Sequence, residues 1–372
     1  MKIVYFTHSL TSCWNHGNAH FLRGVLSELV VRGHDAVALE PRGNWSLANL
    51  LADAGDAGLA PYRRAYPELV ADSYDPADDL AALVDRADLV IVHEWNEPAL
   101  VAALGRLRQR GGRFTLLFHD THHRAVSDPA AIRAFDLSGY DGVLAFGEAL
   151  SAVYRGWGWG ERVWTWHEAA DIRRFHPPGV EGERAGLAWI GNWGDGERTA
   201  ELENFLFALA QAAGLPLDIY GVRYPAEALA MLVRYGALYH GWLPNAAAPA
   251  IFARVLATVH VPRRYYATLL PGIPTIRVFE ALACGIPLVS APWSDSEGLF
   301  RPGRDYLIAD DGPAMTRHLR DLAGDPALRA ALAASGLETI RARHSCGHRV
   351  DALLGIVAQL AVHPAEPVRS VA

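Results

Sequence analysis

The residues best suited to bind a charged ligand lie in the stretch 270–290, where a loop rich in proline and glycine runs into a helical pattern. The pattern predicts a short helix over 275–284, closed by Gly285. The first turn of such a helix offers N–H groups and a partial positive charge, which suit a diphosphate. The charged side chains of this predicted helix, Arg277 and Glu280, are the candidates for contact with such a ligand.

Two side chains of that helix could complete a nucleotide site. Arg277 can add a charge-assisted contact to a phosphate. Glu280 lies about one and a half turns into the helix and can accept hydrogen bonds from ribose hydroxyls. The alternative, which the sequence leaves open, is that both residues form the solvated face of a core helix.

A second turn rich in glycine covers residues 189–198, after a predicted strand and before a predicted helix. Gly191 lets the backbone approach a ligand closely beside Asn192, and Arg198 at the start of the helix suits a phosphate. The spacing fits neither a G-x-G-x-x-G fingerprint nor a P-loop. The alternative is an ordinary loop.

The loop after the first predicted strand, residues 7–20, holds several histidines and asparagines. It follows the carboxyl end of a strand, where doubly wound sheets bind ligands. His16, Asn18 or His20 could therefore contact a bound ligand or its phosphate, and His16 could act as a base. The alternative is that Asn18 and His20 only cap and cover the following helix.

A third cluster, residues 118–123, contains three histidines and an aspartate at another strand end. His119 and Asp120 end this predicted strand and Glu94 ends the preceding one, so we expect all three at the same edge of the sheet. A metal site is the alternative, but it would need a further carboxylate and a second shell that the sequence does not offer. We therefore expect no metal here.

The elements that position these residues alternate between strands and helices. The predicted strands are 2–6, 34–40, 88–93, 113–119, 141–146, 162–167, 187–191, 217–221, 257–261, 287–291 and 305–309. Helical patterns lie between these strands. The first helix is predicted to begin at Asn18, as its cap, and to end at Gly33. Residues 325–361 are also predicted to be helical, with an interruption near His344. Such alternation predicts parallel doubly wound sheets with ligand loops at the carboxyl ends of the strands. The pattern breaks at 171–184, which is the best candidate for a linker.

Length and composition restrict the class of protein. A chain of 372 residues is a natural length for two domains. A net charge of −7 without a basic stripe argues against a nucleic-acid partner. Three widely spaced cysteines fit a reducing compartment. Because no signal peptide or apolar span is apparent, we expect a cytoplasmic protein without a transmembrane segment, which leaves room for peripheral contact with a membrane.

Three motifs resemble GT-B glycosyltransferases, and are most similar to the CgeB-like, "glycosyl transferases group 1" type. The pattern Arg-x-Phe-Glu-Ala-x-Ala-Cys-Gly-x-Pro occurs at 277–287, a Leu-Phe-x-Pro-Gly-x-Asp turn at 299–305, and a His-x-x-x-His-Arg segment at 344–349. The resemblance extends over nearly the whole chain and is most specific in these C-terminal motifs.

This resemblance implies an α/β fold of the GT-B type, with two doubly wound Rossmann-like domains facing a central cleft. Residues 1–172 would form the acceptor-side domain, 173–342 the nucleotide-sugar-binding domain, and 343–372 a C-terminal helix that crosses back to the first domain. Glu280 would be the glutamate that binds ribose, Thr275, Ile276 and Arg277 would line the diphosphate, and Arg198 would contact it. His119 would face the transferred sugar, which makes Asp120 a candidate base.

The implied activity is that of a metal-independent, hexosyltransferase-like glycosyltransferase. It would take a nucleotide-sugar donor as co-substrate, use no other cofactor, and glycosylate a small-molecule or glycan acceptor. Many retaining relatives carry two glutamates in the pattern E-x7-E, and the first of them falls on Gly272 here, so the sequence does not imply a retaining mechanism. The alternatives are a nucleotide-sugar epimerase of the same fold and a non-catalytic GT-B protein that binds a glycan or a nucleotide.

Overall fold

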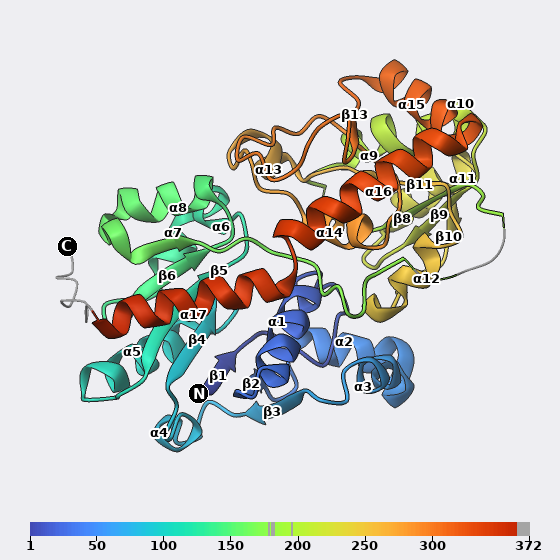
Figure 1. Ribbon diagram of the computed structural model, residues 1–372. Coiled ribbons are helices and arrows are strands. Elements are labelled where there is room, and N and C mark those ends of the chain that lie inside the picture. The colour runs from blue at the N-terminus through green and yellow to red at the C-terminus, as the bar shows by residue number, and fades with distance from the viewer. Residues whose placement is uncertain (178, 180–182, 195, 363–372) are drawn as a thin grey trace. The chain divides into compact units, whose positions relative to one another are not determined.

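The computed structural model describes residues 1–177, 179, 183–194 and 196–362 (Figure 1). The chain divides into two compact units: unit 1 comprises residues 1–168 together with the chain from 346 onward, and unit 2 comprises residues 169–345. The sequence analysis places the domain borders at 172/173 and 342/343. Residues 363–372, at the end of the predicted C-terminal helix, lie outside the described part.

Unit 1 contains one parallel sheet, for which the described residues supply seven strands in the order β3-β2-β1-β4-β5-β6-β7. Its strands are β1 (Lys2–Phe6), β2 (Asp35–Pro41), β3 (Val70–Tyr74), β4 (Leu89–His93), β5 (Thr115–Asp120), β6 (Gly142–Ala145) and β7 (Val163–Thr165). The central strands are buried along their length, as expected for a parallel sheet covered on both faces. The strand order reverses between β1 and β4, which makes the loops after these two strands the topological switch point.

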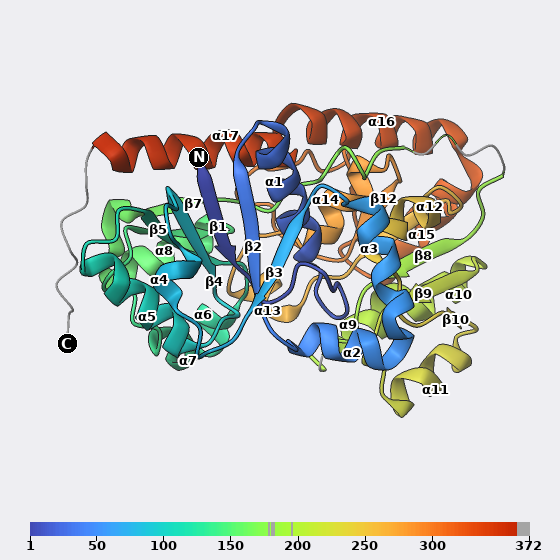
Figure 2. The same cartoon turned by 90° about the horizontal axis from the view of Figure 1, so that it is seen from below.

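Helices connect these strands in unit 1. They are α1 (Ala19–Val31), α2 (Trp45–Ala54), α3 (Ala60–Ala65), α4 (Leu80–Leu83), α5 (Pro98–Gln109), α6 (Arg124–Ser127), α7 (Pro129–Arg133) and α8 (Glu148–Tyr154). The last helix, α17 (Cys346–Val362), also belongs to unit 1 and packs against α1 (Figure 2). Arg32 at the end of α1 forms an ion pair with Asp351 of α17.

Unit 2 repeats the same strand order in a second parallel sheet, β10-β9-β8-β11-β12-β13, of six strands among the described residues. These strands are β8 (Leu187–Ile190), β9 (Leu217–Tyr220), β10 (Leu238–Tyr239), β11 (Ala257–His260), β12 (Leu288–Ser290) and β13 (Leu307–Ile308). The switch point of this sheet lies between β8 and β11. The loops after these strands contain the turn at 191–198 and residues 261–263.

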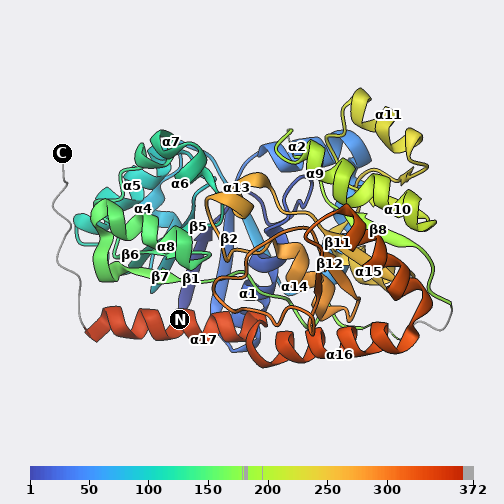
Figure 3. The ribbon, with the colours of Figure 1, turned by 90° about the horizontal axis from the view of Figure 1, so that it is seen from above.

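The helices of unit 2 enclose its apolar core. They are α9 (Thr199–Leu202), α10 (Ala208–Ala213), α11 (Ala226–Arg234), α12 (Ala248–Phe252), α13 (Arg264–Thr268), α14 (Ile276–Ala283), α15 (Gly312–Gly324) and α16 (Pro326–Arg343). Helix α10 packs against α15, and α14 packs against α16 (Figure 3). Buried side chains of the strands and of α10, α15 and α16 form one hydrophobic cluster.

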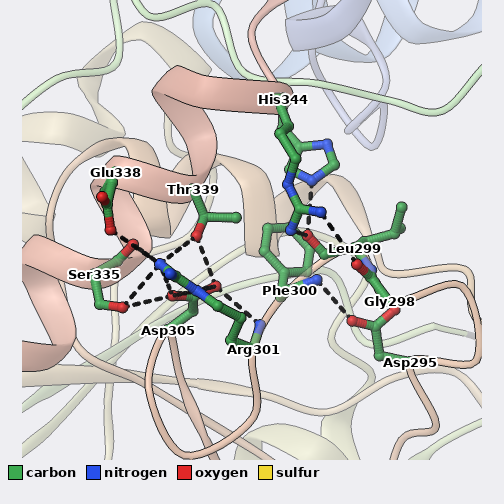
Figure 4. A network of polar contacts seen from close by, with 11 residues as sticks. Asp295, Gly298, Leu299, Phe300, Arg301, Asp305, Ser335, Glu338, Thr339 and His344 are labelled. Carbon is green, nitrogen blue, oxygen red and sulfur yellow. Dashed lines mark hydrogen bonds and ion pairs between the residues drawn. The ribbon is translucent and has the colours of Figure 1, made fainter.

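The turn at 299–305 is fixed to α16 by a network around the carboxylate of Asp305 (Figure 4). Arg301 and the hydroxyls of Ser335 and Thr339 all donate to this carboxylate, and the pKa of Asp305 is lowered because these hydrogen bonds outweigh its burial. Nε2 of His344 is hydrogen-bonded to the Leu299 carbonyl at 2.8 Å. The motif 299–305 thus has a structural role within unit 2.

One local prediction is wrong. Asn18 precedes α1 as predicted, but its side chain makes no capping hydrogen bond, since its backbone is itself helical. Its amide nitrogen donates instead to Oε1 of Glu168, at 2.7 Å. Oδ1 of Asn18, the atom that would accept a capping hydrogen bond, is buried without a hydrogen-bond partner.

Candidate active site

In unit 2 a buried guanidinium spans the switch point. Arg198 precedes α9 and donates to the carbonyl of Asn192, beyond the end of β8 (2.6 Å), and to that of Val261, beyond β11 (3.1 Å). Its Nε is buried without a hydrogen-bond partner, and its Cζ lies 5.1 Å from the ring centre of Trp189. The local sequence explains this position, because the turn at 191–196 contains three glycines and returns the chain to the sheet edge.

The charge of Arg198 is poorly compensated. Burial, together with the positive charges of Arg263 and Arg277, lowers the pKa of Arg198 to about 10. Arg263 forms an ion pair with Glu197 at 3.2 Å. Three arginines therefore bring positive charge to one edge of the second sheet, and the most buried of them retains an unused donor. An anion bound at this edge would relieve the unfavourable electrostatics.

The predicted helix N-terminus lies in the same unit. Thr275 is the N-cap of α14 and has no side-chain capping bond, while Ile276 is the first helical residue and is buried. The first N–H groups of this eight-residue helix have no intrahelical acceptor. Together with the partial positive charge of the helix end, they favour an anion.

Glu280 is fully buried and held between two partners. Arg277 forms an ion pair with it on the same helix, and Nδ2 of Asn245 donates to its Oε1 at 2.6 Å. Burial raises the pKa of Glu280, whereas the charge of Arg277 and the Asn245 hydrogen bond oppose this shift. The sequence analysis missed Asn245, because nothing in the sequence pattern links it to a helix 35 residues further along the chain.

Gly191 and Asn192 form part of the turn that precedes Arg198. The carbonyl of Gly191 accepts a hydrogen bond from the Tyr224 hydroxyl at 2.9 Å, and Oδ1 of Asn192 accepts one from the Val222 N–H at 2.9 Å. The carbonyl of Gly191 and the side chain of Asn192 are thus both bonded to other residues of unit 2. In a ligand site, these two residues would hold the turn in place beside Arg198.

Position 272 cannot hold the glutamate found in many retaining relatives without rearrangement. Gly272 has a φ of +90°, in the left-handed region, and a Cβ there would lie 2.6 Å from Oγ of Ser296 and 2.9 Å from Cγ of Glu297. The backbone conformation and the close neighbours of this turn therefore favour glycine over glutamate at position 272.

In unit 1 the candidate catalytic residues meet in a buried polar cluster. His93 and His119 are register partners at the ends of β4 and β5, and Glu94 and Asp120 follow them directly. Nε2 of His93 lies 2.9 Å from Oε2 of Glu94 and is hydrogen-bonded to the Thr121 hydroxyl. The structure thus brings both carboxylates to the same edge of the sheet.

Asp120 carries a buried carboxyl group whose pKa is raised. Burial raises the pKa of Asp120 to about 7, and the nearby charge of Glu94 contributes in the same direction. Hydrogen bonds from the His122 N–H (3.0 Å) and the Tyr154 hydroxyl (2.7 Å) oppose this shift only in part. Each carboxylate oxygen keeps a second lone pair for a further donor.

The histidines around these carboxylates are held neutral. Burial lowers the pKa of His119 and of His16 well below the usual value, and that of His8 to about 4. His119 is hydrogen-bonded through Nδ1 to the Tyr5 hydroxyl, while the Nε2 atoms of His119 and His16 are buried without hydrogen-bond partners. The cluster therefore contains several uncharged imidazoles beside two carboxylates.

The remaining predicted residues lie apart from this cluster or serve the fold. Asn18 is bound to Glu168, as described above. His20 is fully buried within α1 and does not reach the surface. The sequence analysis did not select His8, His93, Tyr5 or Tyr154. His93 could have been found from its place at a strand end, but Tyr154 reaches Asp120 from a helix 34 residues away.

No three His, Cys, Asp or Glu side chains gather into a possible metal site within the described ranges. None of the helices in the described part of the chain is long and apolar enough to cross a membrane.

The two sheets, with their repeated strand order, define the GT-B fold of two Rossmann-like domains. Residues 198–355 match the model of a family described as "Glycosyl transferase-like". This match confirms the resemblance to GT-B glycosyltransferases, while the CgeB-like subtype stays a prediction. A comparison with the sequences of curated proteins gives no match.

Solved structures with the same fold cover nearly the whole chain. Sucrose-phosphate synthase from Thermosynechococcus elongatus is 14% identical, with a TM-score of 0.68 over 97% of this chain and 100% of its own. HepE from Anabaena, solved with UDP and glucose, gives the same values. BGT from phage T4, solved with its UDP-glucose substrate, is 14% identical, with a TM-score of 0.58 over 96% of this chain and 99% of its own.

Proposed function

We propose that this protein transfers a sugar from a nucleoside diphosphate donor to an acceptor hydroxyl. The observation that carries this proposal is the buried guanidinium of Arg198 at the switch point of unit 2, with an unused Nε and with Arg263 and Arg277 nearby. The match to a glycosyl transferase-like family and the nucleotide complexes of HepE and BGT support the same donor class.

The donor would be held by unit 2. The diphosphate would bind at Arg198 and at the first turn of α14, where cations and N–H groups stabilise the charge that develops on the leaving group. Glu280 would accept hydrogen bonds from the ribose. Arg277 has five N–H donors, so it can keep its ion pair with Glu280 and still contact a phosphate oxygen.

The proton would be handled by unit 1. When the bond between the sugar and the diphosphate breaks, the acceptor oxygen forms the new bond to the sugar and loses its proton. We assign this proton to Asp120, since a carboxyl group with a pKa of about 7 is a suitable base at neutral pH. Glu94 supports the role because its charge keeps the Asp120 carboxylate basic.

The proposal includes catalysis without a metal ion. The arginines of unit 2 can neutralise the diphosphate, which is the task that a divalent cation would otherwise perform. BGT from phage T4 has been solved with UDP and Mn²⁺, so the point needs a direct test. We expect turnover to persist in excess EDTA and to gain little from added Mn²⁺ or Mg²⁺. Loss of activity in EDTA, restored by a metal, would contradict this part of the proposal.

A donor screen tests the function itself. Thermal unfolding would be followed with UDP-, GDP-, dTDP- and ADP-sugars, and nucleotide release would be measured with and without a panel of acceptors. A donor at 100 times its Kd should stabilise the fold by about 2.7 kcal/mol. If no donor stabilises the protein and none is turned over, the proposal is wrong; turnover that yields only an isomerised sugar would indicate an epimerase.

A pair of glutamate variants connects this screen to the site. Glu280→Gln keeps the shape of the side chain and removes its charge, so we expect weaker donor binding with an intact fold. Glu338→Gln is the matched control, because Glu338 is an exposed residue of α16 that pairs with Arg301. Equal donor affinities in both variants would exclude Glu280 from the donor site.

A further inference from the structure

Trp95 is a large exposed aromatic ring beside the candidate catalytic cluster. It directly follows Glu94 at the switch point of unit 1, and 41% of its surface is exposed. Tryptophan is usually well covered in folded proteins, because its ring buries a large apolar area. An exposed ring at this edge of the sheet therefore suggests a ligand-contacting role.

The ring is held in a fixed orientation. Cζ of Arg124 lies 4.0 Å from its ring centre, and Nη2 of Arg124 donates to the carbonyl of Glu94 at 2.6 Å. The rings of His122 and His8 lie 5.0 and 6.4 Å away, centre to centre. The cation–π contact and the hydrogen bond fix the indole plane relative to the carboxylate cluster before any ligand arrives.

The surroundings of Trp95 are polar rather than apolar. In the described parts of the loops after β4 and β5, Trp95 is the one large hydrophobic side chain that is exposed. Its neighbours are two imidazoles and a guanidinium, which can form hydrogen bonds. Burial keeps His8 neutral at physiological pH, with its pKa at about 4, so its ring offers both a donor and an acceptor. A lipid chain would instead need a continuous apolar surface.

We propose that Trp95, with His8, His122 and Arg124, forms a subsite for a saccharide acceptor. A sugar ring has one face of C–H groups and a rim of hydroxyls, which matches a single aromatic face bordered by hydrogen-bonding side chains. The subsite adjoins Glu94 in the chain, so a hydroxyl of the bound sugar would lie near Glu94 and near Asp120, the proposed base. The inference rests on the proposed glycosyl transfer and specifies its acceptor class.

The test compares acceptor kinetics in three variants. With donor at saturation, KM would be measured for glucose, galactose, N-acetylglucosamine and oligosaccharides of these sugars, and for an aliphatic alcohol and a phenol as non-carbohydrate acceptors. We expect Trp95→Ala to raise the KM of the saccharide acceptor about tenfold or more, and Trp95→Phe to restore most of the loss. A comparison of single sugars with oligosaccharides distinguishes a free sugar from a glycan chain.

Trp159→Ala is the matched control. Trp159 also carries a guanidinium over its ring, that of Arg162 at 4.9 Å, but it precedes β7 and so lies at the amino edge of the sheet. Its replacement should leave the acceptor KM unchanged. Donor-induced thermal stabilisation, measured on every variant, shows that the proteins tested are folded.

The outcomes separate this inference from the proposed function. Donor-induced thermal stabilisation should be equal in wild type and Trp95→Ala, because the proposed donor site lies in unit 2. If wild type turns over a donor but Trp95→Ala leaves the saccharide KM unchanged, or if only the alcohol or the phenol is glycosylated, the subsite is wrong and the transferase stands. If wild type binds and turns over no donor, the proposed function itself fails.

Discussion

The two sheets share a strand order, yet their switch points are spanned by different side chains. In unit 1 the amide of Asn96 donates to the carbonyls of Phe6 and His93, at the ends of β1 and β4 (3.0 and 2.8 Å). In unit 2 the guanidinium of Arg198 donates to carbonyls beyond β8 and β11. The geometric task is the same, but one side chain is neutral and the other is a buried cation.

This difference sets the chemistry of each edge. Around Asn96, burial holds the pKa of His119 well below its usual value and raises the pKa of Asp120 to about 7, with Glu94 close by. Around Arg198 positive charge accumulates, so an anion is favoured. The comparison teaches that one topology can support proton transfer or anion binding, depending on the charge placed where the strand order reverses.

The largest effect is expected when the proton site of unit 1 is removed. Asp120→Asn keeps an oxygen for the Tyr154 hydroxyl but cannot ionise. Because a general base contributes about 10²- to 10⁴-fold, transfer should slow by that factor while donor affinity stays unchanged. Initial rates at saturating donor and acceptor, with Kd from calorimetry, would check this. An unchanged rate would assign the proton to another group.

The same carboxyl group predicts a pH dependence of stability. Its pKa is about 7 in the folded protein and about 3.9 in an unfolded chain. The folded state therefore binds the extra proton, and its stabilising contribution, at most about 4 kcal/mol, is complete below pH 4 and is lost as the pH rises through 7. Urea unfolding at several pH values should show this slope for wild type and lose it in Asp120→Asn. Equal slopes in both proteins would contradict the shifted pKa.

In unit 2, Arg198→Lys tests whether a positive charge alone is enough. An ammonium group cannot reproduce the planar fork that spans two carbonyls and would contact a phosphate through its remaining N–H. Donor affinity should fall about 10- to 100-fold, as expected for losing a charged hydrogen bond. Arg234→Lys, in an exposed position of α11, is the control and should bind donor as wild type does. Similar Kd values for the two variants would remove Arg198 from the donor site.

The smallest effect should come from the structural network of unit 2. Thr339→Val removes one hydroxyl that donates to Asp305, which should cost about 1–2 kcal/mol of unfolding free energy. Donor affinity should not change, because this network serves the fold. Thr316→Val in α15 is the control substitution and should cost less. A loss of donor affinity in Thr339→Val would show that the turn at 299–305 also serves the ligand.

The strands were largely predictable because parallel strands buried on both faces read as continuous apolar runs. Residues 89–93 are an example, with four aliphatic residues before His93. The edge strand Val70–Tyr74 was missed, since most of its residues are exposed and its polar residues follow no alternation. The two-residue strand Leu238–Tyr239 is too short to leave a pattern.

The site was predictable only where it follows strand ends. His119, Asp120 and Glu94 were selected for that reason, and the structure places them together, although their roles stay proposals. Their partners come from distant segments: the Tyr154 hydroxyl bonds to Asp120 from α8, and Asn245 reaches Glu280 from the loop before α12. Such pairings depend on tertiary packing, and no local propensity encodes them.

The packing of α17 on α1 also has a consequence for how the protein is made. During translation the ribosome synthesises all of unit 2 before α17. Unit 1 therefore lacks its last helix while the 177 residues of unit 2 are made. The indole of Trp166 and the side chain of Arg32, which bind α17 in the finished protein, lack those partners until then. Unit 2 is thus synthesised as an insertion within an incomplete domain, and the final folding step of unit 1 is delayed until α17 has been made.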